Sequence, residues 1–336
     1  MYKQFYNLKQ NPFEITPDPE FLFASEKHKE ALTALYYGVL GRKGFVVMTG
    51  EVGTGKTLLV RTLLQMIKSQ NMACSYVFNS NVDPTDFLRL IAFDFGLPCK
   101  ATSKGELLVE LNSYLLACHQ KKITAVLVID EAHHLSAEVL EEIRLLMNLE
   151  TAQEKLLQIL LAGQPELDAK LDSFELRQLK QRIAVRCHLE ALTQAEARQY
   201  IQSRLRTAGC DRSDAAKLFP SDTVARIHRY TGGIPRLINL VCENALLVAC
   251  SCQLRQVTPD ILQEIACNFR LTEIGPVPQE PSQKSELWQS VKNLLEFNGS
   301  SETRNQEAIL SDQGLDSDPY TAVKSARSYA EGTRRR

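Results

Sequence analysis

A glycine-rich stretch, GEVGTGKT, occupies residues 50–57 between an apolar run and a run with helical periodicity. Its pattern, GxxxxGK followed by Ser or Thr, is rare by chance and typical of turns that hold nucleotide phosphates. Backbone N–H groups at the start of the following helix can bind phosphate, and Lys56 can reach the β- and γ-phosphates. The Thr57 hydroxyl can ligate Mg²⁺. The residues that we expect to bind ATP are Gly50, Glu51, Val52, Gly53, Thr54, Gly55, Lys56, Thr57 and Leu58.

Two carboxylates, Asp130 and Glu131, follow the apolar run AVLVI. The carboxyl ends of parallel strands meet at one edge of a sheet, so these acids belong beside the glycine-rich turn. There Asp130 can hold Mg²⁺ together with Thr57, and Glu131 can polarise the water that attacks the γ-phosphate. Two acids at a strand end can also be ordinary solvated residues, but the nearby turn favours the catalytic interpretation.

A neutral amide, Gln164, ends the next apolar run, LQILLAGQPEL. At the same edge of the sheet, its side chain can sense the γ-phosphate and hold the attacking water, which makes it a third catalytic candidate. The alternative is a structural role in which Gln164 caps or turns the chain.

Three arginines, Arg177, Arg182 and Arg186, lie in the segment ELRQLKQRIAVR. Phosphoryl transfer spreads negative charge over the γ-phosphate, and a guanidinium supplied by a neighbouring subunit can stabilise that charge. At least some of the three must be ordinary solvated charges. A fourth, Arg236, follows two glycines and Pro235 in the first turn of a helix, where it can contact the γ-phosphate from a mobile lid.

Short apolar runs alternate with helical stretches between residues 45 and 190. This alternation predicts an α/β fold in which helices cover both faces of a parallel sheet. After residue 192 the strand signals stop, and four helical stretches predict a small all-helical domain. Beyond residue 271, Pro, Ser and Gly dominate, which is typical of disorder, with one short helical candidate around Trp288. We expect a P-loop ATPase core at 1–191, a helical lid domain at 192–271 and a mostly disordered tail at 272–336.

The composition is that of an ordinary globular chain, with 44% hydrophobic and 24% charged positions among 336 residues. A net charge of -1 gives no global electrostatic argument for nucleic acid or for an anionic membrane. The sequence shows neither a basic leader nor an apolar run long enough for a membrane span. Nine cysteines without a repeated spacing suit reduced thiols, so we expect a cytoplasmic protein.

The letters DEAH, at residues 130–133, also occur in nucleic-acid helicases. Such motors need two tandem sheet domains, and the helical pattern after residue 192 excludes a second one. We therefore reject the helicase interpretation and expect His133 and His134 to begin the next helix.

Together these motifs resemble the AAA+ ATPases, and residues 1–271 resemble the ExeA family, also called general secretion pathway protein A. The resemblance rests on the opening FYNLKQNPFEITPDPEFLFASEKHKEAL and on GEVGTGKT, VIDEAHHL, LAGQPEL, LKQRI and GGIPRLIN. It implies a Walker A loop at residues 50–57, with Asp130 and Glu131 as the Walker B pair. It further implies that Gln164 is sensor 1, Arg182 the arginine finger and Arg236 sensor 2.

The same resemblance implies that Phe13 and Ile15 flank the adenine. Family members that act in type II secretion carry a membrane span and a periplasmic peptidoglycan-binding module after the ATPase, and this sequence shows neither. Shorter relatives accompany exopolysaccharide and protein-sorting systems, and transposition regulators of the TniB type share the core.

We therefore expect a homo-oligomeric ATPase that drives assembly or remodelling in secretion or in envelope or exopolysaccharide export. A partner protein of the membrane system would hold it at the inner membrane. The alternative is an ATP-dependent DNA-binding regulator of transposition or recombination.

Overall fold

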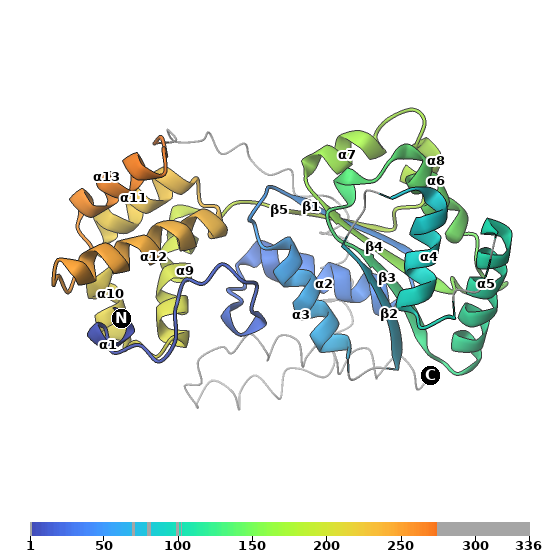
Figure 1. The fold of residues 1–336 in the computed structure, drawn as a ribbon, viewed down its shortest axis with the longest axis horizontal. Coiled ribbons are helices and arrows are strands. Elements are labelled where there is room, and N and C mark those ends of the chain that lie inside the picture. The colour runs from blue at the N-terminus through green and yellow to red at the C-terminus, as the bar shows by residue number, and fades with distance from the viewer. Residues whose placement is uncertain (1, 69–70, 79–81, 99–100, 102, 274–336) are drawn as a thin grey trace, which may run out of the picture. The chain divides into compact units, whose positions relative to one another are not determined.

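A five-stranded parallel sheet forms the centre of the computed structural model, which describes residues 2–68, 71–78, 82–98, 101 and 103–273 (Figure 1). The strands lie in the order β2-β3-β4-β1-β5, and every neighbouring pair is parallel. Their bounds are β1 Phe45–Gly50, β2 Met72–Val77, β3 Thr124–Ile129, β4 Leu157–Gly163 and β5 Val185–Leu189. The predicted α/β fold is confirmed.

The central strands are buried on both faces, because alternate side chains enter two different apolar clusters. Val46 and Met48 of β1 share one cluster with α2 (Glu26–Leu40) and α3 (Lys56–Ile67). Phe45 and Val47 of the same strand share the other cluster with the helices on the opposite face (Figure 1). Those helices are α4 Pro84–Asp94, α5 Lys104–Gln120, α6 Ala137–Leu146, α7 Pro165–Leu171 and α8 Arg177–Lys180. This double cover explains why the strands read as nearly continuous apolar runs.

The register of the sheet brings three strand ends together. Thr49 of β1 lies opposite Gly163 of β4, and Ile129 of β3 lies opposite Leu161 of β4. Since β4 separates β1 from β3, the residue that follows β4 lies between the loop after β1 and the acids after β3.

After β5, every element within the described residues is a helix. The helices are α9 Gln194–Thr207, α10 Arg212–Leu218, α11 Ser221–Thr231, α12 Pro235–Ser251 and α13 Pro259–Asn268. A capping box between Thr193 and Glu196 starts α9, and Gly232, in the left-handed conformation with φ 57°, ends α11. We call residues 192–271 the helical region.

The N-terminal segment, residues 2–23, packs against the helical region. Its first helix, α1 (Tyr2–Phe5), lies beside α12 (Figure 1), where the Tyr2 hydroxyl donates to the Glu243 carboxylate. Further along the segment, the Phe13 ring packs edge-on against Phe219, with 5.9 Å between the ring centroids. These contacts place the segment in the apolar cluster of the helical region.

Arg204 of α9 fixes the same segment with a buried charge. Its guanidinium donates to the backbone carbonyls of Pro12 and Glu14 and to the Tyr200 hydroxyl. It also stacks over the Phe21 ring at 4.8 Å from the centroid, close to the short 3₁₀ turn η1 (Pro19–Phe21). A buried guanidinium is tolerable here because carbonyl and hydroxyl oxygens accept its hydrogen bonds.

The predicted tail lies outside the described residues apart from positions 272 and 273, and so does the helix expected around Trp288. Within the described ranges, every helix is too short or too polar to traverse a lipid bilayer.

Candidate functional site

The glycine-rich loop between β1 and α3 has conformations that glycine allows. Gly53 and Gly55 have φ of 82° and 103°, in the left-handed region that other residues rarely enter. Gly55 occupies the N-cap of α3 and has no side chain, so the first N–H groups of the helix are available to an anion. Val52 lies exposed at the tip of the loop, whereas Thr54 is buried and donates its hydroxyl proton to the Glu51 carbonyl.

Lys56 places its ammonium group inside the curve of this loop. Its Nζ donates to the carbonyls of Gly50 at 2.8 Å and Glu51 at 2.9 Å. Burial lowers the pKa of Lys56, while the nearby carboxylates of Glu131 and Asp130 act in the opposite direction. The loop therefore contains a positive group where the β- and γ-phosphates of a nucleotide would lie.

Thr57, in the first turn of α3, and Asp130, directly after β3, come together. The Thr57 hydroxyl donates to Asp130 Oδ2 at 2.8 Å, and the Tyr76 hydroxyl of β2 donates to the same oxygen at 2.9 Å. The Glu131 backbone N–H donates to Asp130 Oδ1. A carboxylate next to a hydroxyl is a pair of hard oxygen ligands of the kind that Mg²⁺ prefers, so these residues fit that ion. Sequence reasoning missed Tyr76, because only the pairing of β2 with β3 brings it here.

Glu131 adopts the left-handed conformation, with φ 53° and ψ 36°. Its Oε2 lies 3.4 Å from His133 Nδ1, and His133 Nε2 lies 2.9 Å from the Gln164 side-chain nitrogen. The two histidines do not begin the next helix, so that expectation was wrong. They lie in the 3₁₀ turn η2 (Ala132–His134), because Ser136 caps the N-terminus of α6 and this helix begins only at Ala137.

A narrow hollow of about 30 Å³ opens beside the loop at Thr54 and Gly55. It is lined from three distant parts of the chain: the N-terminal segment with α2, the loop with α3, and the helical region. The remaining residues that line it are Leu22, Phe23, His28, Leu58, Leu192, Tyr200 and Pro235. His28 Nε2 lies 3.0 Å from the Thr54 carbonyl, which ties α2 to the loop.

Neither of the residues expected to flank adenine lines this hollow. Phe13 has no exposed surface and packs against Phe219, so it offers no surface to a base. Ile15 is 53% exposed.

Arg182 lies away from the loop of its own chain. Its guanidinium donates to the Asn148 side chain at 2.7 Å and to the Arg144 carbonyl at 3.3 Å, near the C-terminus of α6. Two residues later, the Ala184 N–H donates to the carbonyl of Phe45, the first residue of β1. The loop starts at the far end of β1, roughly 16 Å away at about 3.3 Å per strand residue. The structure therefore does not bring Arg182 together with the loop.

The other two arginines of this segment have different surroundings. Arg177 is exposed and stacks on the exposed ring of Phe174, 4.1 Å from the centroid. Arg186 forms ion pairs with Asp168 at 3.4 Å and Asp172 at 3.8 Å.

The first turn of α12 lies directly against the loop. The Arg236 N–H donates to the Gly53 carbonyl at 3.2 Å, and a Cβ added to Gly53 would lie 2.7 Å from the Arg236 Cβ. The Arg236 side chain is exposed. The structure thus brings the backbone of Arg236 to the glycine-rich loop.

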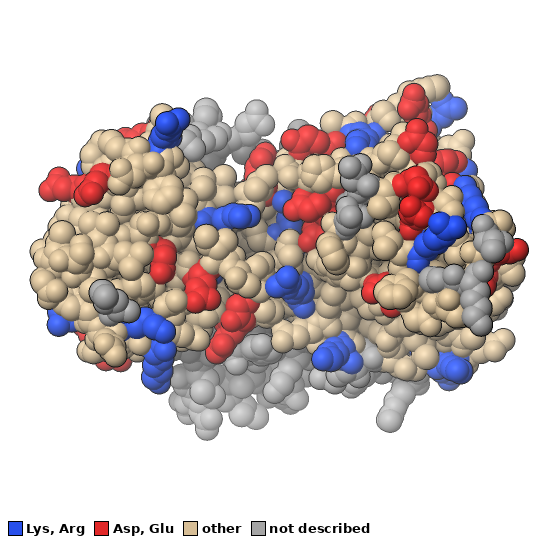
Figure 2. Space-filling model, in the orientation of Figure 1, with Lys and Arg blue, Asp and Glu red and all other residues tan. Residues whose placement is uncertain are grey.

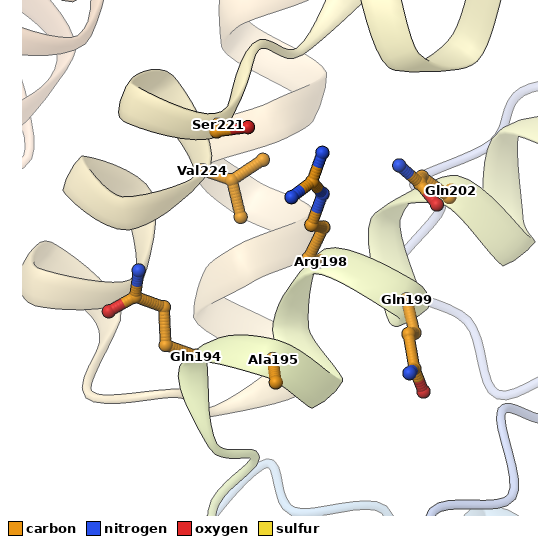
Figure 3. A pocket seen from close by; sticks show the side chains of 7 residues that line it. All are labelled: Gln194, Ala195, Arg198, Gln199, Gln202, Ser221 and Val224. Atoms are coloured by element: carbon orange, nitrogen blue, oxygen red, sulfur yellow. The ribbon is translucent and has the colours of Figure 1, made fainter. Parts of the chain in front are cut away.

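A larger hollow, of about 580 Å³, lies on the helical region away from the loop (Figure 3). Figure 3 shows Arg198 extending from α9 toward Ser221 and Val224 of α11. The hollow has no contact with the loop residues described above.

These observations define a class of protein. A glycine-rich GxxxxGKT loop on a doubly covered parallel sheet, with acids at the end of a nearby strand and a helical region that touches the loop, is the arrangement of an AAA+ ATPase. Residues 39–171, which include the loop and both acids, match the AAA domain family. The ORC2 protein of Aeropyrum pernix, in its ADPNP-ADP complexes, has a similar fold, with a TM-score of 0.56 at 16% identity over 80% of this chain and 73% of that one. The Cdc6 protein of Pyrobaculum aerophilum also has it, with a TM-score of 0.59 at 18% identity over 76% of this chain and 72% of that one.

A curated relative narrows the class. Over 250 residues the chain is 44% identical to General secretion pathway protein A of Aeromonas hydrophila. The match covers 74% of this chain and 45% of the relative, so the chain spans less than half of the relative's length. The protein is an AAA+ ATPase of the ExeA family.

Proposed function

We propose that the protein binds ATP with Mg²⁺ and hydrolyses it to ADP and phosphate. The observation that carries this proposal is the 2.8 Å contact between Thr57 and Asp130, with Lys56 in the loop on one side and Glu131 on the other. Thr57 and Asp130 would hold Mg²⁺, and the ion would neutralise charge on the phosphate oxygens. Lys56 binds the β- and γ-phosphates in this proposal, and Glu131 polarises the attacking water.

Gln164 and Arg236 would report the state of the γ-phosphate. Gln164 follows the strand that separates the loop from the acids, so its amide is near the place where the γ-phosphate would lie. Arg236 belongs to the turn that rests on Gly53. We propose that the sheet with its covering helices acts as the core and that the helical region, with the N-terminal segment packed on it, acts as the lid. Loss of the γ-phosphate would change the contact between them.

Arg182 would serve the nucleotide of a neighbouring subunit in a homo-oligomer. The position of its segment at the opposite edge of the sheet supports this role, because the guanidinium cannot approach its own loop without a large rearrangement. Its contact with the C-terminus of α6 leaves it only partly buried.

The biological role follows from the relative's name. We propose that ATP turnover drives assembly or remodelling in secretion or envelope export, on the cytoplasmic side of the inner membrane and with a membrane-system partner. On the face shown in Figure 2, basic and acidic side chains of the described residues are interspersed, which gives no support to a DNA-binding regulator.

Substitution of Glu131 by Gln tests the proposal. The amide keeps the shape of the side chain but cannot polarise water, so ATP binding should persist while turnover falls by about 10²- to 10⁴-fold. Glu138→Gln, an acid in the first turn of α6, is a matched control that should keep parental turnover. A parent protein that binds no ATP, or a Glu131→Gln variant with parental turnover, would refute the proposed chemistry. DNA binding that depends on ATP and weakens steeply with salt would favour the DNA-binding regulator instead.

A further inference from the structure

His133 contacts two residues of the site, Gln164 and Glu131, that come from different parts of the sequence. Its Nε2 lies 2.9 Å from the Gln164 amide nitrogen, and its Nδ1 lies 3.4 Å from Glu131 Oε2. The side chain of His133 is 8% exposed, whereas that of its neighbour His134 is exposed to solvent. The imidazole ring of His133 therefore lies between the proposed γ-phosphate sensor, Gln164, and the proposed catalytic carboxylate, Glu131.

The backbone around His133 is also fixed to the end of β4 and to α7. Lys170 Nζ donates to the carbonyls of His133 at 2.8 Å and Leu135 at 2.7 Å. A Cβ added to Gly163 would lie 3.2 Å from the His133 backbone nitrogen, so the turn and the strand end approach closely. A displacement at the junction of β4 and α7 would thus reach the ring through both backbone and side chain.

The donor and the acceptor in the hydrogen bond between Gln164 and His133 can be assigned. Burial lowers the pKa of His133, and the neighbouring His134 adds to this effect, so the ring is neutral at pH 7. A neutral imidazole has one N–H donor and one acceptor nitrogen. Because the Gln164 amide nitrogen can only donate, His133 Nε2 accepts, and the ring proton is on Nδ1, which lies 3.4 Å from Glu131 Oε2 without a hydrogen bond between the two atoms.

We propose that His133 is a positioning residue that couples the γ-phosphate sensor Gln164 to the orientation of Glu131. When the Gln164 amide turns to a γ-phosphate oxygen it releases Nε2, and the His133 ring can then shift together with the Glu131 carboxylate. This inference rests on the proposed ATPase function and adds a regulatory link between two of its residues. His133 itself touches neither water nor nucleotide in this scheme.

Steady-state kinetics of His133→Ala test the coupling, with His134→Ala as the matched control. Loss of the hydrogen bond from Gln164 and of the contact with the Glu131 carboxylate should lower kcat by about 10- to 100-fold in His133→Ala, with KM nearly unchanged. His134→Ala should keep parental values. His133→Asn should recover part of kcat, because its amide can donate to Glu131 from the position of Nδ1.

A double-mutant cycle separates coupling from general damage. If His133 acts through Gln164, the double variant of His133→Ala and Gln164→Ala should turn over no more slowly than the slower single variant. Losses that multiply would show that the two residues act independently, which would contradict the proposal.

Imidazole ¹⁵N NMR of the full chain gives a readout that does not depend on turnover. The six histidines give a tractable spectrum, and His133→Asn assigns the relevant ring. The His133 signals should show the neutral Nδ1–H form and should change with a non-hydrolysable ATP analogue and Mg²⁺, but not with ADP and Mg²⁺. Equal responses to both nucleotides, or none to either bound nucleotide, would overturn the proposal.

The two proposals fail in different ways. A parent protein that does not hydrolyse ATP removes the proposed function and this inference with it. If the parent protein hydrolyses ATP normally and the turnover of His133→Ala equals that of His134→Ala, only the inference about His133 fails.

Discussion

Gly53 is the point where the glycine-rich loop meets the helical region, and its substitution by alanine tests whether that contact is tight. The residue has φ 82°, and an added Cβ would lie 2.7 Å from the Arg236 Cβ and 3.1 Å from the Ile234 side chain. Atoms this close must move apart. Gly53→Ala should therefore force the first turn of α12 away from the loop or strain both.

The expected cost has two parts that a second glycine can separate. The left-handed conformation costs a residue with a Cβ about 1–2 kcal/mol. The overlap with α12 adds about 1–3 kcal/mol, as overpacking does in well-packed cores. Gly96, at the end of α4, has φ 80°, and no atom of the described residues lies within 4 Å of its added Cβ. Gly96→Ala should thus lose only the free energy that the left-handed conformation costs.

Urea unfolding of the two variants measures the difference. Gly53→Ala should lose about 1–3 kcal/mol more free energy of unfolding than Gly96→Ala, at a similar m value. If α12 moves away and so relieves the strain, the difference in free energy of unfolding between the two variants becomes smaller. In that case ATP affinity should fall in Gly53→Ala but not in Gly96→Ala. Equal stability combined with equal ATP affinity in the two variants would refute the contact between loop and helical region.

Two further predictions concern the site. Arg182→Ala should bind ATP almost normally but hydrolyse it slower by on the order of 10³-fold, and mixing it with Lys56→Ala should restore part of the activity, since a mixed interface can pair an intact loop with an intact arginine. Arg177→Ala should cost less, and no gain in confirmed mixed oligomers would exclude action between subunits. Tyr76→Phe removes one donor to Asp130 and should raise the Mg²⁺ concentration needed for half-maximal turnover by about tenfold; an unchanged requirement would show that the Tyr76 hydroxyl does not help to orient the carboxylate.

The sheet and the loop could be predicted from sequence because their signals are local. Five apolar runs mark the strands, and the spacing of Gly50, Gly55 and Lys56 within eight residues is itself the signal for the loop. The order of the strands was not predicted, although it decides that Gln164 lies between the loop and the acids.

The missed features depend on contacts between distant segments. Tyr76 reaches Asp130 only after β2 pairs with β3, and Tyr200 joins the hollow at Thr54 only after the helical region packs. The aromatic residues of the opening were a visible sign that this stretch is buried, but nothing local shows which surface covers it. The left-handed backbone of Glu131 has no sequence signal either, since glutamate rarely adopts it.

The packing of α1 on α12 has a consequence for how the polypeptide is made. Tyr2 and Glu243, which share a hydrogen bond, are 241 residues apart. At about 5–20 residues per second, a ribosome needs roughly 12–50 s to add the residues between them. The aromatic side chains of α1 are therefore without their partner surface throughout that interval. The strands β1 to β5 are all complete before its end and can pair by then. A nascent chain should thus carry a folded sheet together with an α1 segment whose aromatic side chains are uncovered, and this segment is the part most in need of a chaperone until α12 emerges.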